Sequence, residues 1–209
     1  MDTFDVLPGD LLKGTGDHCL GEDIAQNICI VDVLCALSDT KYGDLLRQMS
    51  ETVPGTFQHS MQVANLAAEA AIRIGAKSQL VRTGVLYHDI GKMENPAFFT
   101  ENQSGGVNPH KNLNYEQSAQ VVISHVTDGL KLADKHNLPK VIKDFISTHH
   151  GRGKTKFFYI SWKNEHPDEE PNEELFTYPG PNPFSKETAI LMMADAVEAA
   201  SRSLPEYTG

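Results

Sequence analysis

The sequence predicts an all-α domain interrupted by two long loops. Apolar residues recur at helical spacing in several segments, whereas alternating strand patterns are nearly absent and only residues 156–160 (KFFYI) form a candidate strand. Two segments without a period, residues 93–114 and 151–184, are the predicted loops, and loops of this length usually serve a function. The length of 209 residues fits one such domain, and the sequence contains no internal repeat.

Three helices are predicted in the first half of the chain. Residues 42–49 form a short helix, and Pro54 with Gly55 separates it from the first core helix. That helix ends at Gly75, which is placed as its C-cap, and residues 78–90 form the second core helix. The apolar residues with helical spacing in the two core helices are Val63, Leu66, Ala67, Ala70, Ala71, Ile74, Leu80, Val81, Val85 and Leu86.

Three more helices are predicted in the second half. They cover residues 116–135, residues 139–150 and the segment from Ser185 to Ser203. Gly151 is placed to stop the second of them, and Ser185 is a favourable N-cap for the last.

The segment that precedes these helices is predicted to have two parts. Residues 1–27 are rich in Gly and Asp without a sustained period, which indicates a loosely ordered leader. An apolar run follows at residues 28–37, so the predicted domain spans residues 28–209.

The composition excludes several classes of protein. No stretch approaches 18 consecutive apolar residues and no secretory signal opens the chain, so the sequence predicts no membrane span and no export. Three cysteines without C-x-x-C spacing argue against a disulfide framework and indicate a reducing cytosol. The net charge of −10 leaves a mildly basic body at residues 41–163. That distribution suits a small anionic ligand rather than a nucleic acid polymer, or else the acidic segments only solvate the chain.

Histidine and aspartate residues on successive predicted helices are the most informative feature. One buried histidine is more often a hydrogen-bonded core residue than a ligand, but a whole set of such residues needs partners, and a shared metal centre would supply them. Imidazole and carboxylate groups suit divalent iron, manganese, cobalt, nickel or zinc. The absence of C-x-x-C and H-E-x-x-H motifs argues against a structural zinc site or a zincin. The candidate ligands are His59, His88, Asp89, His125, His149, His150 and Asp195.

This ordered series, H…HD…H…HH…D, resembles that of the HD-domain metal-dependent phosphohydrolase superfamily. The longer motifs are similar to one branch, the PgpH-type domains, which follow seven transmembrane helices and hydrolyse cyclic di-AMP. The resemblance covers about residues 30–205. The motifs that carry it are PGTFQHSMQVANLA (54–67), GVLYHDIGKMENPAFFTENQ (84–103), NPH (108–110), SHVTDGLKLA (124–133), LPKVIKDFISTHHG (138–151) and DAVEAASRSL (195–204).

A second branch shares the metal ligands. The HD-GYP phosphodiesterases hydrolyse cyclic di-GMP and carry a GYP signature in the loop after HDIGK. The corresponding loop here reads MENPAFFTENQSGGVNPH and has no GYP. The resemblance therefore favours cyclic di-AMP over cyclic di-GMP.

The resemblance implies an HD-domain helical bundle that binds two divalent metal ions, with Mn²⁺ or Fe²⁺ favoured. Two such ions about 3.5–4 Å apart activate a bridging water and hold phosphate oxygens during in-line displacement. Asp89 would bridge the ions and, with Lys92, carry the catalytic role. The first ion would be held by His59, His88, Asp89 and Asp195, and the second by Asp89, His125, His149 and His150.

Several of these roles leave alternatives open. His150 would be a ligand, a hydrogen-bond donor behind the ligands or a phosphate contact, and Lys92 would contact a phosphate oxygen or be an ordinary exposed lysine. Asn102 and His110 would line the nucleotide pocket or make hydrogen bonds within their loop. Gly91 is expected to permit the turn after the metal-binding pair. Aromatic residues beside the loop are expected to anchor it to the core rather than to stack on adenine; they are Phe98, Phe99 and Tyr115.

The function implied by the resemblance is hydrolysis of cyclic di-AMP to linear pApA. The alternatives are a nucleotidase of the same superfamily that acts on another nucleotide, a cyclic di-GMP phosphodiesterase and a non-catalytic nucleotide sensor. Full-length PgpH-type proteins are anchored in the membrane, whereas this chain has no predicted span and ends at Gly209. We therefore expect a cytoplasmic domain, shortened at its C-terminus, of a membrane-anchored protein.

Overall fold

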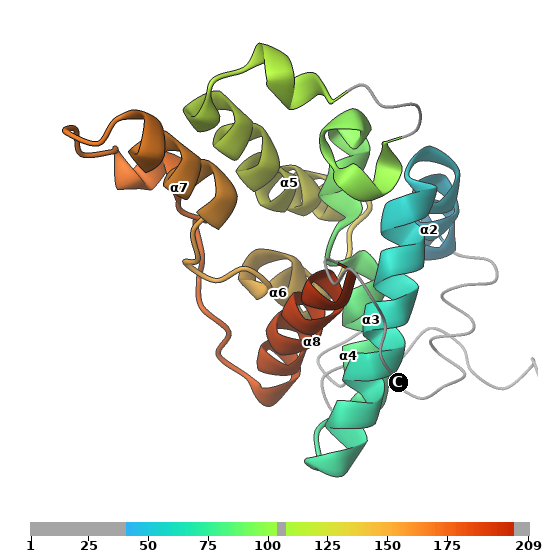
Figure 1. Cartoon of the computed structure of the whole chain (residues 1–209). Coiled ribbons are helices and arrows are strands. Elements are labelled where there is room, and N and C mark those ends of the chain that lie inside the picture. Colours follow the sequence, from blue (N-terminus) through green and yellow to red (C-terminus); the bar gives the residue numbers. More distant parts are fainter. Residues whose placement is uncertain (1–40, 104–107, 203–209) are drawn as a thin grey trace, which may run out of the picture.

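The structure, a computed structural model, describes residues 41–103 and 108–202. These residues form seven α-helices and several short 3-10 helices but no strand, apart from an isolated bridge between Lys154 and Thr177 (Figure 1). The predicted all-α class is therefore confirmed. The predicted leader at residues 1–27 and the apolar run at residues 28–37 lie outside the described residues.

The first three helices agree with the prediction except at one end. They are α2 (Lys41–Thr52), α3 (Pro54–Arg73) and α4 (Ser78–Tyr87). Gly75 has a φ of +66° and closes α3 as expected.

The end of α4 is the exception, because the predicted helix over 78–90 stops at Tyr87. After Tyr87 the backbone winds more tightly, because the amides of His88 and Lys92 donate to carbonyls only three residues earlier. The chain then continues as the 3-10 helix η2 (Ile90–Glu94).

The second half carries the three predicted helices α5 (Tyr115–Lys135), α6 (Lys140–Thr148) and α8 (Lys186–Arg202). A capping box formed by Asn114 and Gln117 begins α5. Gly151, with a φ of +54°, follows α6. Ser185 precedes α8, and its hydroxyl accepts a hydrogen bond from the amide of Thr188 at 3.2 Å, as expected of an N-cap.

The prediction for residues 151–184 is wrong in one respect. The candidate strand at 156–160 is the start of a helix, α7 (Lys156–Glu165), so this segment is not a loop throughout. Aromatic residues favour strands in general, but packing overrides that preference here. Trp162 is buried in a second apolar cluster that joins α7 to α5 and to the 3-10 helix η6 (Glu173–Phe176), where Phe176 is also buried.

The loop at residues 93–114 contains no α-helix in its described part. It is built from three short 3-10 helices, η3 (Pro96–Phe98), η4 (Thr100–Asn102) and η5 (Pro109–Asn112). No helix in residues 41–103 or 108–202 has both the length and the apolar character that a bilayer span requires.

Six of the described helices form the main core. In Figure 1, α3 runs beside α8, and α4 and α6 lie behind them. Helix α3 packs on α2, α4 and α8, while α6 packs on α4, α5 and α8. The largest fully buried apolar side chains of this core are Leu45, Met49, Ile90, Phe145, Ile146 and Leu191. The packing brings the C-terminal ends of α4 and α6 next to α3, α5 and α8.

Phe145 tests how much the main core contributes to stability. Phe145→Ala should lower the free energy of unfolding by about 3–5 kcal/mol, because the side chain is 1% exposed and its removal leaves a cavity. The matched control is Phe157→Ala on α7, where the ring is 72% exposed and the expected change is within about 0.5 kcal/mol. Chemical denaturation followed by circular dichroism measures both variants, and equal effects would contradict this description of the core.

Candidate metal centre

The structure brings all seven predicted ligands together. They come from five helices: His59 from α3, His88 and Asp89 from the end of α4, His125 from α5, His149 and His150 from the end of α6, and Asp195 from α8. Five of them are almost completely buried, because His59, His88, Asp89, His125 and His149 are each at most 3% exposed. His150 and Asp195 are partly buried and mark the side that faces solvent.

The carboxylate of Asp89 lies at the centre of the cluster. Its Oδ2 lies 3.3 Å from Nε2 of His88 and 3.7 Å from Nε2 of His59. Its Oδ1 lies 3.4 Å from Nε2 of His125 and 3.5 Å from Nε2 of His149. The two oxygens of one carboxylate therefore face two different pairs of imidazoles.

The ligand atoms form two groups on either side of this carboxylate. In the first group, ligand atoms of His59, His88 and Asp89 lie within 4.8 Å of one another, and Oδ1 of Asp195 lies 3.0 Å from Nε2 of His59. In the second group, ligand atoms of His125, His149 and His150 also lie within 4.8 Å of one another.

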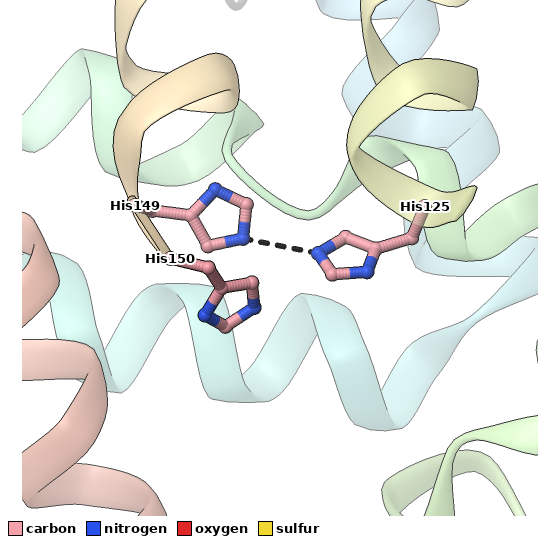
Figure 2. A group of neighbouring side chains, drawn as sticks. All are labelled: His125, His149 and His150. Atoms are coloured by element: carbon pink, nitrogen blue, oxygen red, sulfur yellow. Dashed lines mark hydrogen bonds between the residues drawn. The ribbon is translucent and has the colours of Figure 1, made fainter. Parts of the chain in front are cut away.

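Figure 2 shows the second group. His149 and His150 project from the end of α6 toward His125 on α5, and Nε2 of His125 lies 3.0 Å from Nε2 of His149. Each group thus has enough ligand atoms to hold one ion.

Hydrogen bonds behind the imidazoles fix their orientation. Nδ1–H of His88, His125 and His149 donates to the backbone carbonyl three residues earlier, at 2.6, 2.6 and 2.8 Å respectively. His59 differs, because its Nδ1 contacts a carboxylate oxygen of Glu198 at 2.7 Å. In each case the Nδ1 proton is held away from the cluster, so the lone pair of Nε2 points into it.

Such an arrangement requires a cation. Nε2 of His88 and Oδ1 of Asp89 are buried without any hydrogen-bond partner, which is costly for polar atoms. Nε2 of His125 and Nε2 of His149 face each other as two acceptors unless a positive charge lies between them. A divalent ion beside each oxygen of Asp89 would satisfy all of these atoms, so the residues fit the predicted metal centre.

The electrostatics of the first group agree with this interpretation. Burial alone would lower the pKa of His88, but the carboxylates of Asp89 and Asp195 outweigh it and raise that pKa to about 10. Burial would raise the pKa values of Asp89 and Asp195, yet their contacts with the imidazoles, and that of Asp89 with Lys92, hold both well below the usual range. Without a metal ion, a proton on His88 therefore supplies the missing positive charge.

In the second group the pKa values of two imidazoles are lowered, whereas that of His88 in the first group is raised. Burial lowers the pKa of His125 to about 3, and it also lowers the pKa of His150 well below its usual value. Both imidazoles are therefore neutral at physiological pH, which is the form that binds a metal ion.

Lys92 is held beside the cluster by two carboxylates. Its Nζ lies 2.7 Å from Oδ2 of Asp89 and 2.7 Å from Oε1 of Glu101, and the side chain is only 12% exposed. Burial would lower the pKa of Lys92, but these two carboxylates raise it above its usual value. Lys92 is therefore a positively charged, largely buried group and not an ordinary exposed lysine.

The other two predicted substrate contacts take part in structural hydrogen bonds. Asn102 accepts from the amide of Thr56 at 3.0 Å and donates to its hydroxyl at 2.8 Å, which ties the loop to the start of α3. Nε2–H of His110 donates to the carbonyl of Phe98 at 3.0 Å. These bonds correspond to the structural alternative for both residues, and contact with a substrate stays a prediction. Phe99 is buried at 6% exposure, as an anchor residue should be.

Sequence reasoning missed three residues that contact the predicted site residues. Glu198 contacts His59, and its position three residues after Asp195 on one helix could have indicated this. Glu101 holds Lys92, although the loop pattern gave no sign of it. The ring of Tyr178 packs on His150 with 4.2 Å between the centroids, and no local pattern marks it.

Gly91 has a different role from the one expected. It is not among the described residues with positive φ; instead, a Cβ atom at this position would lie 1.9 Å from the carbonyl oxygen of His125 and 2.4 Å from the amide of Gly129. The absence of a side chain thus lets η2 pack directly on the backbone of α5. This contact sets the spacing between Asp89 and His125.

Gly91→Ala should therefore disrupt the centre. The added methyl group must push η2 away from α5, which should lower the melting temperature and weaken Mn²⁺ binding together, because Asp89 moves with η2. Thermal denaturation and Mn²⁺ titration measure the two effects. Normal Mn²⁺ binding by a folded variant would show that the close approach does not position Asp89.

Metal binding should also release protons. Below its pKa of about 10, His88 carries a proton in the metal-free protein and must lose it to become a ligand. The apparent affinity for Mn²⁺ should consequently rise with pH up to about pH 10. Titration calorimetry in buffers of different ionisation enthalpy counts the protons released, and binding without proton release near neutral pH would contradict the assigned charge state.

Comparison with known proteins shows the family to which the chain belongs. The family model described as "HD domain" matches residues 56–200. Two relatives named "Cyclic-di-AMP phosphodiesterase PgpH" are 46% identical over 78% of this chain (Listeria monocytogenes serotype 1/2a, strain 10403S) and 44% identical over 77% of it (Bacillus subtilis, strain 168). The chain spans only 23% and 22% of their respective lengths.

A solved structure is similar as well. It is the HD domain of the L. monocytogenes phosphodiesterase PgpH in complex with cyclic-di-AMP, which is 46% identical with a TM-score of 0.75 and covers 78% of this chain and 76% of that chain. The family match covers more than half of the chain and includes every predicted ligand from His59 to Asp195. The chain therefore belongs to the HD domain family.

Proposed function

We propose that this domain is a metal-dependent phosphodiesterase that hydrolyses cyclic di-AMP to linear pApA, using two divalent ions, Mn²⁺ or Fe²⁺. The observation that carries the proposal is the Asp89 carboxylate, whose two oxygens face two separate groups of ligands. The substrate is proposed from the 46% identity and the shared fold with an HD domain solved in complex with cyclic-di-AMP. We propose the cytoplasm as the compartment. Three cysteines without C-x-x-C spacing argue against a disulfide framework, and the absence of such a framework favours a reducing compartment.

When bound, two divalent ions would supply a water nucleophile of lowered pKa and neutralise phosphate oxygens. Asp89 would bridge them; His59, His88 and Asp195 would complete the first set of ligands, and His125, His149 and His150 the second. Neutral imidazoles suit this task because each keeps an Nε2 lone pair directed inward.

Lys92 would bind the phosphate directly. An ammonium group has three N–H donors, and the contacts of Lys92 with Asp89 and Glu101 use two of them. The third is proposed to donate to a phosphate oxygen that gains negative charge in the transition state. The two carboxylates keep Lys92 charged and hold it in place, so little reorganisation accompanies the reaction.

The reaction would open one phosphodiester bond. The water oxygen would lose a proton and bond to phosphorus while the bond from phosphorus to the 3′-oxygen breaks. The 3′-oxygen would take up one proton, which matches the one that the water releases. The product is pApA with a 5′-phosphate. We infer that pApA leaves before a second cleavage, because the linear product is more flexible and carries additional charge.

Chromatography of the products tests the function. The Mn²⁺-loaded domain is incubated separately with cyclic di-AMP, cyclic di-GMP and nucleoside mono- and triphosphates, and cyclic di-AMP should be consumed fastest with pApA formed first. Asp89→Ala should abolish turnover, because both ions lose their shared ligand. Faster hydrolysis of cyclic di-GMP or of a mononucleotide, or formation of AMP without pApA, would contradict the proposal. Binding of cyclic di-AMP without turnover would instead indicate a sensor.

Lys92→Ala should reduce kcat by about 10²–10³-fold while the domain still binds metal, because a donor to the transition state is lost. The matched control is Lys131→Ala, which removes a lysine from an exposed ion pair with Asp128 on α5. Steady-state kinetics, with metal content measured for each variant, separates the two effects. A kcat for Lys92→Ala equal to that of Lys131→Ala would exclude the assigned role.

A further inference from the structure

The four histidines with Nδ1 held behind the cluster are not supported in the same way. His88, His125 and His149 each donate to a backbone carbonyl of their own helical turn. His59 instead meets a side-chain carboxylate, that of Glu198, whose Oε2 lies 2.7 Å from Nδ1. A carboxylate behind a metal-binding imidazole makes the imidazole a stronger ligand than a carbonyl does, because it adds a negative charge.

One helix controls both nitrogens of His59. Asp195 and Glu198 lie three residues apart on α8 and so share a face of that helix. Oδ1 of Asp195 lies 3.0 Å from Nε2 of His59, on the side of the cluster, while Glu198 contacts Nδ1 on the opposite side. The imidazole ring is therefore clamped along the line that joins its two nitrogens.

The stability of the fold does not account for Glu198. The residue is 8% exposed, and its second oxygen, Oε1, is buried without a hydrogen-bond partner. Arg202, one turn later on α8, contacts Oε2 at 3.0 Å and offsets part of the charge. Burying a carboxylate is costly even when it is paired, and an apolar side chain would fill such a position at lower cost. A function at the metal centre explains why a charge is placed there.

The two groups of ligands also differ in charge. The first group contains Asp195 and Oδ2 of Asp89, with Glu198 directly behind His59. The second group consists of the imidazoles of His125, His149 and His150 and shares only Oδ1 of Asp89. Lys92 contacts the same Oδ2, and Arg202 contacts Glu198, so these two residues offset part of the negative charge. Asp195 has no counterpart in the second group, and a divalent ion is therefore attracted more strongly to the first group.

From these contacts we propose that Glu198 is a positioning residue that acts through His59 to strengthen the binding of the ion in the first group. The domain consequently holds two unequal ions, with the ion in the first group bound more tightly. The inference rests on the metal centre of the proposed function, but not on its substrate.

Titration with Mn²⁺ tests the proposal, with free Mn²⁺ followed by electron paramagnetic resonance in the absence of nucleotide. The wild type should show two classes of bound ion. Glu198→Ala should weaken the tighter class by about 10–100-fold and leave the weaker class unchanged. Glu198→Gln should weaken it less, because the amide oxygen still accepts from Nδ1–H of His59. The matched control is Glu69→Gln, an exposed carboxylate on α3, which should change neither class.

Two variants, each of which lacks one ligand of one group, identify the ion whose binding depends on Glu198. In a His149→Ala background, where the first group remains, Glu198→Ala should still weaken the remaining ion. In a His59→Ala background, Glu198→Ala should not weaken Mn²⁺ binding further, because Glu198 acts on the ion only through His59. Circular dichroism checks that each variant is folded, and Glu198→Gln decides the matter should Glu198→Ala not fold.

The outcomes separate this inference from the proposed function. Equal weakening of both ions by Glu198→Ala, no weakening by either substitution, or an effect that persists without His59 would overturn the role of Glu198. A wild type that binds no Mn²⁺ would overturn the metal centre itself. Binding of two ions without hydrolysis of cyclic di-AMP would leave the role of Glu198 standing and contradict only the proposed reaction.

Discussion

The buried carboxylate of Asp89 is the group on which the rest of the site depends. A negative charge at 2% exposure is stable only when positive charge surrounds it, since the cost of an unpaired buried ion is several kcal/mol. The inward-facing Nε2 atoms of His59, His88, His125 and His149 lie around it at 3.3–3.7 Å, and Lys92 contacts it from outside the cluster. In the metal-free protein, Lys92 and a proton on His88 balance this charge. A metal ion bound among the imidazoles would take the place of that proton.

The fold meets this requirement in part by placing four of the seven ligands where α4 and α6 end. The last carbonyls of a helix have no partner within it, and those of Val85 and Ile146 accept the Nδ1 protons of His88 and His149. The change from α4 to the 3-10 helix η2 then turns Asp89 inward, and the missing side chain of Gly91 lets η2 pack against α5. The local structure thus fixes the orientation of the ligands before a metal ion binds.

Much of this could be predicted from the sequence, because the ligands are polar residues in apolar helices and stand out by their pattern. HDIGK and the order of the other histidines indicated both the family and the metal centre.

Contacts between residues far apart in the sequence could not be predicted. The helix α7 forms because Trp162 packs on α5, which overrides the strand preference of KFFYI. Asn102 and Thr56 are 46 residues apart yet bond to each other, and Glu198 reaches His59 across 139 residues. The role of Gly91 likewise depends on a neighbouring backbone rather than on its own conformation.

The central claim is that Asp89 bridges two metal ions, and an anomalous difference map tests it most directly. Crystals of the Mn²⁺-loaded domain should show two peaks about 3.5–4 Å apart, one beside each oxygen of Asp89. One of them should lie among His59, His88 and Asp195, and the other among His125, His149 and His150. A single peak in the first group, or no peak in fully loaded crystals, would contradict the claim.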